Sequence, residues 1–164
     1  MIHHINCNVL DTYTSIIAHQ VNCMGVMGSG VASQIKSRYP EAYKAYKELC
    51  DNNSHYRIGL LGRTQLCPVS FNTDGTPRIY VANMFGQYSY GRSKYTVYTD
   101  YPSLRQCLGS LSELATSLNA IIALPYKIGC SRGNGDWERV VYPMIESMLK
   151  NNDVLLCEHN VGVV

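Results

Sequence analysis

The sequence predicts an α/β fold, a three-layer α/β/α sandwich around a mixed, mostly parallel sheet. One reason is that short apolar runs of strand length alternate with longer segments whose apolar residues recur every three or four positions. Another is that the runs at 16–21 and 120–125 each lead into a glycine-rich segment that opens a helical pattern. Because ligands bind at the carboxyl ends of strands in open α/β sheets, we expect a site at these two segments.

Length and composition fit one domain over residues 1–164. The chain has 164 residues, of which 46% are hydrophobic, which is enough for a substantial core. A net charge of +2 and the lack of a basic run argue against a nucleic-acid partner. There is neither an apolar signal core nor a stretch of about 18 apolar residues. We therefore expect a cytoplasmic monomer without membrane contact.

The cysteines predict reduced thiols. There are seven of them, an odd number, and they are scattered without a C-x-x-C pair. This pattern argues against a disulfide framework and against a zinc site. We expect no metal and no cofactor, and metal-independent behaviour.

The first half of the chain alternates strands and helices. Helices are expected after Gly30 and from Pro40, because proline disfavours helix at the residue before it and starts a helix well. The polar run 51–54 ends the second helix. The turn residues 72–77 separate two strands. The strands expected in this half are 2–10, 16–21, 58–62, 66–69 and 78–83.

The second half begins with a segment of little periodicity, 84–98, rich in Tyr, Gly and Ser, which is either a functional loop or an exposed connection. A helix follows over 100–119, with Thr99 or Asp100 as its cap and a proline in its first turn. After the strand 120–125, an apolar helical stripe begins at Trp137. Pro143 interrupts it, so the regular helix is expected near Tyr142 after a looser turn. The last strand is expected at 154–157.

The first glycine segment, His19–Ala32, has the layout of an anion site. Glycine carries no Cβ, so its backbone can reach positive φ and approach a ligand closely. Successive N–H groups and the start of the following helix then favour a phosphate. The spacing GxxGxG is neither a Walker loop nor the dinucleotide fingerprint GxGxxG. The alternative is a strand-to-helix turn that needs glycine only for its geometry.

The second glycine segment, Ile128–Asp136, follows the strand 120–125. Its position after a buried strand and before a helical stripe repeats the arrangement of the first segment. Two such loops at one sheet edge could hold both sides of a diphosphate.

These two blocks, His19–Pro40 and Leu124–Val140, resemble the macrodomain family, the ADP-ribose-binding module. Within it the chain is similar to the subgroup of the fungal ADP-ribose-1″-phosphate phosphatase, the terminal ADP-ribose glycohydrolase and the macrodomain antitoxins, which share the Asn-Cys pair matched by Asn22 and Cys23. The resemblance implies a macrodomain-like fold and ADP-ribose or ADP-ribose 1″-phosphate as ligand.

Two departures bear on the reaction. Ala32 stands where MacroD-type hydrolases place a water-positioning Asp. No lysine lies near 83–86, where the glycohydrolase and antitoxin branch has one, unless Lys94 reaches in from the loop. The resemblance therefore implies a phosphatase acting on the 1″-phosphate. The alternatives are an ADP-ribose-binding module without turnover, or a hydrolase that removes ADP-ribose from protein or nucleic acid.

The resemblance also implies ligand contacts. Asn8 would accept from the adenine amino group, the Val9 backbone would contact adenine, Asn22 would meet the distal ribose, and Phe85 would wall the ligand unless it is a core residue. The two loops would line the diphosphate and ribose with Cys23, Gly25, Val26, Met27, Gly28, Ser29, Gly30, Val31, Ile128, Gly129, Cys130, Ser131, Arg132, Gly133, Asn134 and Gly135.

The candidate acid–base residues are His19 and Asp136, because phosphoryl transfer onto water needs a group that holds or supplies a proton. Each has a structural alternative. A histidine at a strand end can be a hydrogen-bonded structural residue, and Asp136 can cap the helix that begins at Trp137.

Overall fold

The computed structural model describes residues 1–159 and contains a six-stranded sheet of order β1-β6-β5-β2-β4-β3. Only the pairing of β3 with β4 is antiparallel, so the sheet is mixed and mostly parallel, as predicted. The strands are β1 (Ile2–Ile5), β2 (Ile16–Asn22), β3 (Thr64–Phe71), β4 (Pro77–Gln87), β5 (Ile122–Pro125) and β6 (Val154–Cys157).

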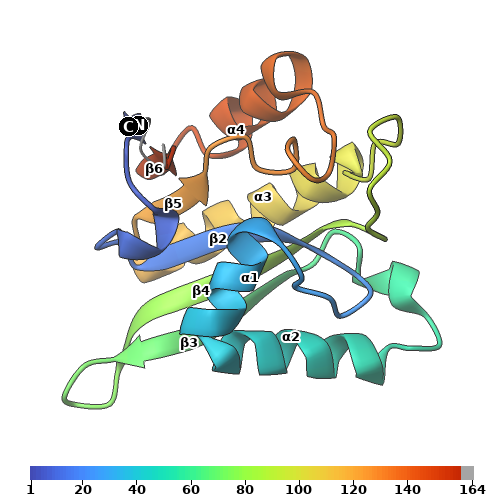
Figure 1. Cartoon of the computed structure of the whole chain (residues 1–164). Coiled ribbons are helices and arrows are strands. Elements are labelled where there is room, and N and C mark those ends of the chain that lie inside the picture. Colours follow the sequence, from blue (N-terminus) through green and yellow to red (C-terminus); the bar gives the residue numbers. More distant parts are fainter. Residues whose placement is uncertain (160–164) are drawn as a thin grey trace, which may run out of the picture.

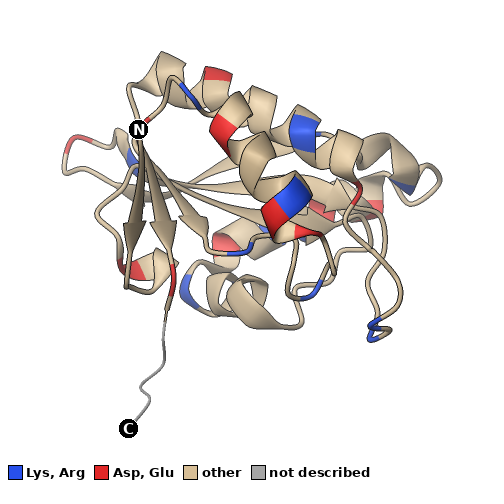
Figure 2. Ribbon diagram, turned by 90° about the horizontal axis from the view of Figure 1, so that it is seen from above, with Lys and Arg blue, Asp and Glu red and all other residues tan. Residues whose placement is uncertain are grey.

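Helices cover both faces of this sheet, which confirms the three layers (Figure 1). One core cluster lies between the sheet and α3 and α4, and two others lie between the sheet and α1 and α2. Figure 2 shows the sheet between its helices, with charged residues spread over the surface. The helices are α1 (Gly30–Arg38), α2 (Pro40–Asn52), α3 (Tyr101–Leu118) and α4 (Tyr142–Met148).

Strand β2 runs through the middle of the sheet and alternates between its two faces. Ile16 and Ala18 pack with α3 and α4, whereas Ile17 packs in a cluster under α1 and α2. The same period of two sends His19 toward the α1 and α2 layer and Gln20 toward the opposite layer, where their hydrogen-bond partners lie. The strand therefore delivers polar side chains to both faces at its carboxyl end.

Local signals explain the helix ends. The Asp100 carboxylate accepts from the backbone N–H of Ser103 at 3.1 Å and caps α3, and Asn119 ends this helix in the left-handed region with φ 50°. A π-helical turn, Trp137–Val141, precedes α4, which confirms the looser turn expected before Tyr142.

Several predicted strands were wrong in extent or type. The strands expected at 66–69 and 120–125 are Thr64–Phe71 and Ile122–Pro125. The first strand stops at Ile5, and Val9–Asp11 form a 3-10 turn because the Asn8 side chain caps it, accepting from the N–H of Leu10 at 3.0 Å. The run 58–62 contains a 3-10 helix, Arg57–Leu60, in which only Leu60 is buried. Strand β4 continues four residues past Asn83 because β2 pairs with it as far as Gln87 and β3 as far as Met84.

No helix within residues 1–159 is long and apolar enough to cross a membrane.

Candidate functional site

A cavity of about 490 Å³ opens at the carboxyl ends of β2, β4 and β5. Three loops enclose it, one after each strand. The first loop (22–30) lies within the predicted glycine segment His19–Ala32, and the second loop (126–136) contains the predicted segment Ile128–Asp136. The third loop is 88–98. The lining residues are His19, Gln20, Val21, Asn22, Val26, Gly28, Ser29, Gly30, Val31, Ala32, Gln87, Tyr90, Gly91, Arg92, Pro125, Tyr126, Lys127, Ile128, Gly129, Ser131, Arg132 and Gly133.

The first loop is held in shape by Asn22 and by Tyr46 from α2. The Asn22 amide accepts from the N–H of Met24 at 2.9 Å and donates to the carbonyl of Val26 at 2.8 Å. The buried Tyr46 hydroxyl donates to the Asn22 carbonyl at 2.7 Å and accepts from the N–H of Val26 at 3.1 Å. These bonds satisfy the backbone polar groups of the turn, so the loop is formed before any ligand arrives.

Part of the first loop faces the core instead of the cavity. Cys23 and Met27 are buried in a cluster with Tyr46, and a Cβ on Gly25 would lie 3.1 Å from Lys47. The cavity side consists of Gly28, Ser29 and Gly30, where α1 begins. The unpaired N–H donors of a helix start therefore border the cavity.

The second loop is compact and packed against protein. Gly129 has φ 74°, and a Cβ there would lie 2.9 Å from Oε1 of Gln20. A Cβ on Gly133 would collide with Oγ1 of Thr99 and with the carbonyl of Gly129. Lys127 also adopts a positive φ of 58°, which is uncommon for a long side chain and marks local strain.

Part of the segment 84–98 lies at the cavity, since the third loop supplies Tyr90, Gly91 and Arg92 to its wall. It is fastened to the second loop. The Asn134 amide nitrogen donates to the carbonyls of Ser93 and Thr96 at 2.7 and 2.8 Å. The carbonyl of Gly133 accepts from the N–H groups of Tyr98 and Thr99. The two loops therefore form one connected wall.

Gln20 joins this wall to the sheet. Its amide nitrogen donates to Oε1 of Gln87 at 2.8 Å and to Oγ1 of Thr99 at 2.9 Å, and Thr99 donates to the carbonyl of Gly129 at 2.6 Å. Gln20 is a residue of the site that the sequence reasoning did not identify. The signal that could have found it is the pair of consecutive polar residues, His19 and Gln20, near the end of an apolar strand, because two successive side chains face opposite sides of a sheet.

His19 lies on the other face of β2 and is 2% exposed. Its Nε2 is 2.6 Å from Oδ1 of Asn83, whose amide nitrogen donates to Oε1 of Gln65 at 3.1 Å. This orientation of Asn83 places the imidazole proton on Nε2 and leaves Nδ1 as an acceptor. Burial lowers the pKa of His19 to about 4, so the ring is neutral at pH 7.

Within residues 1–159, two buried side-chain polar atoms lack a hydrogen-bond partner, Nδ1 of His19 and Oε1 of Gln20. Both are acceptors, because the proton of His19 and the amide hydrogens of Gln20 are already donated elsewhere. Both residues line the cavity. Oε1 of Gln20 is enclosed by Gly86 and Gly129, so Nδ1 of His19 is the acceptor that remains for a hydroxyl donor of a ligand.

Asp136 serves as a cap. Its carboxylate accepts from the N–H of Arg139 at 3.0 Å, ahead of the π-helical turn, and it does not line the cavity. The structure thus bears out the capping alternative for this residue and places its carboxylate outside the cavity wall.

Five of the seven cysteines are buried, and Cys7 and Cys130 are half-buried. All seven lie within residues 1–159 and are free thiols, as predicted. Burial raises the pKa of Cys23 to about 12 and that of Cys130 to about 11, so neither thiol forms a nucleophilic thiolate near neutral pH. Burial also raises the pKa of Cys67 to about 11 and those of Cys107 and Cys157 to about 12.

Several residues expected to contact the ligand lie elsewhere. Asn8 caps the 3-10 turn and donates to Oε1 of Gln34 at 2.8 Å, and Phe85 is fully buried with its ring centroid 5.7 Å from that of Tyr46. The expected residues that do not line the cavity are Asn8, Val9, Cys23, Gly25, Met27, Phe85, Cys130, Asn134 and Gly135. The loops that carry most of them still form the wall.

The cavity wall is cationic. Arg92, Lys127 and Arg132 line it, and the lining residues within 1–159 include no Asp or Glu. In that same part of the chain no three His, Cys, Asp or Glu side chains lie close enough to hold a metal ion. The wall therefore suits an anion.

Comparisons with known proteins agree with this geometry. The Macro domain family model matches residues 18–144. The ADP-ribose 1″-phosphate phosphatase of Meyerozyma guilliermondii is 32% identical, with 92% of this chain and 90% of the relative covered. A macrodomain protein from Streptomyces coelicolor has a TM-score of 0.77 at 27% identity, covering 98% of this chain and 100% of that one. The macrodomain of Mycobacterium tuberculosis DarG has a TM-score of 0.74 at 25% identity, covering 97% of each chain. The chain belongs to the Macro domain family.

Proposed function

We propose that the protein binds ADP-ribose and hydrolyses the phosphate ester of ADP-ribose 1″-phosphate. The observation that carries the proposal is the cavity, where two glycine loops, a helix start and three cationic side chains face one space. Backbone N–H donors and positive charge are what a diphosphate and a phosphate monoester require. The Meyerozyma guilliermondii relative named for this activity aligns with 92% of this chain.

The two glycine loops hold the ligand in this proposal. Gly28, Ser29 and Gly30 approach the distal ribose and the diphosphate, where an absent Cβ leaves room for close contact. Residues 128–133 close the other side. Asn22 borders the distal ribose, and its amide keeps the first loop in shape through the bonds to Met24 and Val26.

His19 is the proton acceptor in the proposed reaction. Hydrolysis adds water to phosphorus and breaks the bond between phosphorus and the ribose oxygen, which takes a proton from solvent as it leaves. The buried Nδ1 of His19 has no partner and can accept from an attacking water that reaches it. The low pKa keeps the ring neutral at pH 7, and its one proton, on Nε2, is donated to Asn83, so His19 is not an acid in this reaction. His19 therefore acts as a base and an orienting group.

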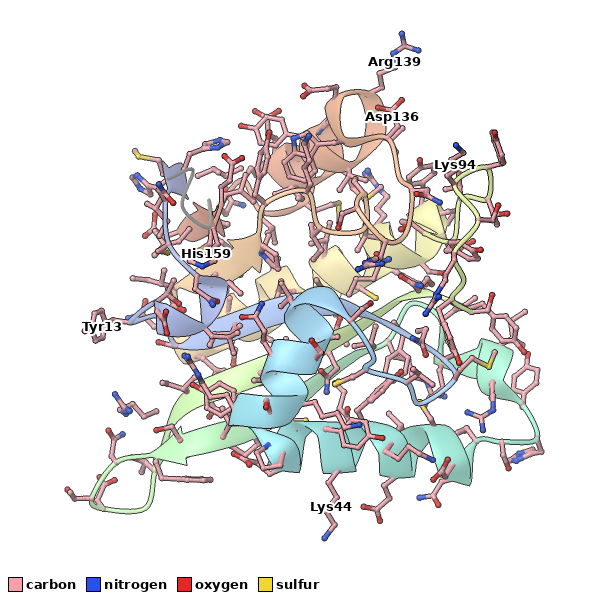
Figure 3. All side chains as sticks on the ribbon, viewed as in Figure 1. Tyr13, Lys44, Lys94, Asp136, Arg139 and His159 are labelled. Carbon is pink, nitrogen blue, oxygen red and sulfur yellow. The ribbon has the colours of Figure 1, made fainter. Side chains whose placement is uncertain are left out.

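The test is phosphate release from ADP-ribose 1″-phosphate, with ADP-ribose binding by calorimetry in the same samples. His19→Gln should lower the rate about 100-fold or more and retain binding, because general base catalysis contributes about that much. Asn22→Ala should lose both, because the first loop loses its shape. The control is Tyr13→Ala, a fully exposed side chain that points away from the rest of the molecule (Figure 3).

The outcomes separate the alternatives. Binding without phosphate release in the wild type would make the protein an ADP-ribose-binding module. If the wild type shows neither binding nor release, the proposed function is wrong.

A further inference from the structure

Two of the cavity's cations come from different loops, and hydrogen bonds join these two loops. We call Arg92 of the third loop and Arg132 of the second loop the arginine pair; both are exposed and line the cavity. Arg92 directly precedes Ser93, whose carbonyl accepts from Asn134. Arg132 directly precedes Gly133, whose carbonyl accepts from Tyr98 and Thr99. Each arginine is thus one residue from a hydrogen bond that joins the two loops.

Nothing in the described wall neutralises this pair. The ion pairs found within residues 1–159 lie elsewhere and use Met1, Arg38 and Lys47 as their cations. The carboxylates of Asp100 and Asp136 cap helical segments, do not line the cavity and form no ion pair with either arginine. Two like charges on one wall repel each other, and a bound anion would relieve that repulsion.

The chemistry of the pair indicates the kind of anion. A guanidinium is planar, always charged and able to donate two parallel hydrogen bonds to the oxygens of one phosphate. The backbone N–H groups that border the cavity at Gly28–Gly30 carry only partial charge. Two full charges on the facing wall suit a group with more charge than one bridging phosphate, such as a terminal phosphate monoester.

We propose that the arginine pair forms a subsite for the terminal phosphate monoester of the ligand and makes the cavity discriminate between a phosphorylated ligand and its dephosphorylated product. This inference rests on the proposed function. It assigns Arg92 and Arg132 the role of specificity residues that bind the dianion, while the glycine loops hold the part shared by substrate and product.

The experiment compares two constants for each variant, the KM for ADP-ribose 1″-phosphate and the Kd for ADP-ribose. Arg92→Gln and Arg132→Gln should each raise KM about tenfold, since a charged hydrogen bond contributes about that much, and should change the Kd for ADP-ribose less than about threefold. The double variant should raise KM further.

Matched controls come from the same two regions. Lys94→Gln removes a cation two residues from Arg92, and Arg139→Gln removes one from the turn after the second loop. Neither side chain lines the cavity, and both lie at the outer surface in Figure 3. These variants should leave both constants unchanged.

Each negative result would contradict a different proposal. If the wild type releases phosphate but Arg92→Gln and Arg132→Gln shift KM no more than the controls do, the subsite is wrong and the proposed function stands. If both variants weaken ADP-ribose as much as its phosphate ester, the pair binds the diphosphate and the proposed discrimination is wrong. If the wild type neither binds ADP-ribose nor releases phosphate, both proposals are wrong.

Discussion

The first and second loops both contain glycines, but for different physical reasons. In the first loop, a Cβ on Gly30 would meet nothing within 4 Å, and one on Gly28 would make only an ordinary 3.5 Å contact with Val26. In the second loop, a Cβ on Gly129 or Gly133 would press against Gln20 or Thr99. The first loop keeps space open for a ligand, whereas the second loop uses the space to pack against protein.

The glycines at the cavity therefore have different roles, ligand binding in the first loop and structural support in the second. Side chains from α2 and β2 fix the first loop, and its glycines at the cavity are spared from packing. The second loop supports the third loop and depends on it, so its glycines are structural as well as ligand-facing. Substitutions should therefore lower stability in the second loop and ligand affinity in the first.

The largest effect on stability is expected from Gly133→Ala. The new methyl group would overlap Oγ1 of Thr99 and the carbonyl of Gly129, one of which is backbone and cannot rotate away. Overpacking of this kind costs about 3 kcal/mol of unfolding free energy. Urea denaturation checks it, and a loss below about 0.5 kcal/mol would contradict the packing role of this glycine.

The next effect is the dependence of stability on pH through His19. Burial lowers the pKa of folded His19 from 6.5 to about 4, so between these values the unfolded chain binds a proton that the folded chain does not. This contribution is fully present above pH 6.5 and is lost as the pH falls toward 4, for a total of about 3 kcal/mol. Denaturation of the wild type and His19→Gln between pH 4 and 6.5 isolates the contribution of His19. The plots of unfolding free energy against pH should differ in slope only within this range.

A smaller effect is expected from Asp136→Ala at the end of the second loop. The variant loses the cap on the turn that leads to α4, which should cost about 1 kcal/mol of unfolding free energy. Phosphate release should stay at the wild-type rate under conditions where the protein is folded, because the carboxylate does not line the cavity. A strong loss of rate in a folded sample would restore Asp136 as a catalytic candidate.

The smallest effect on stability is expected from Gly28→Ala. Its Cβ has room, so the free energy of unfolding should change by less than about 0.5 kcal/mol. The same methyl group would occupy space at the cavity wall, and ADP-ribose affinity should fall about tenfold or more by calorimetry. Gly28→Ala and Gly133→Ala together test whether the cavity glycines of the first loop serve ligand binding and those of the second loop serve packing. An unaltered ADP-ribose affinity in Gly28→Ala would contradict this difference between the loops.

The sequence predicted those parts of the molecule that depend on local signals. The order of strands and helices, the cap at Asp100 and the loose turn before Tyr142 all follow from spacing, proline and capping residues within a few positions. The 3-10 turn at Val9–Asp11 was not predicted, because the alternation of 2–10 indicates a strand whereas the Asn8 side chain caps the turn. The extension of β4 was not predicted, because it depends on pairing with β2 as far as Gln87, and 84–87 has little periodicity of its own.

The candidate site was predicted in outline only. Both glycine loops reach the cavity, but which of their residues face it depends on packing with distant segments, such as Tyr46 against Cys23 and Met27. The network of Gln20, Gln87, Thr99 and Gly129 joins positions more than one hundred residues apart. Neither spacing nor composition contains that information.

The buried thiols can report where the folded protein opens locally. Cys67 lies on β3, Cys107 on α3 and Cys157 on β6, and burial keeps all three protonated near neutral pH. An alkylating reagent reacts with the thiolate, so each site should be modified only when its segment opens and regains an ordinary pKa. The order in which these three positions become labelled would show whether β3, β6 or α3 opens first, without a substitution in the chain.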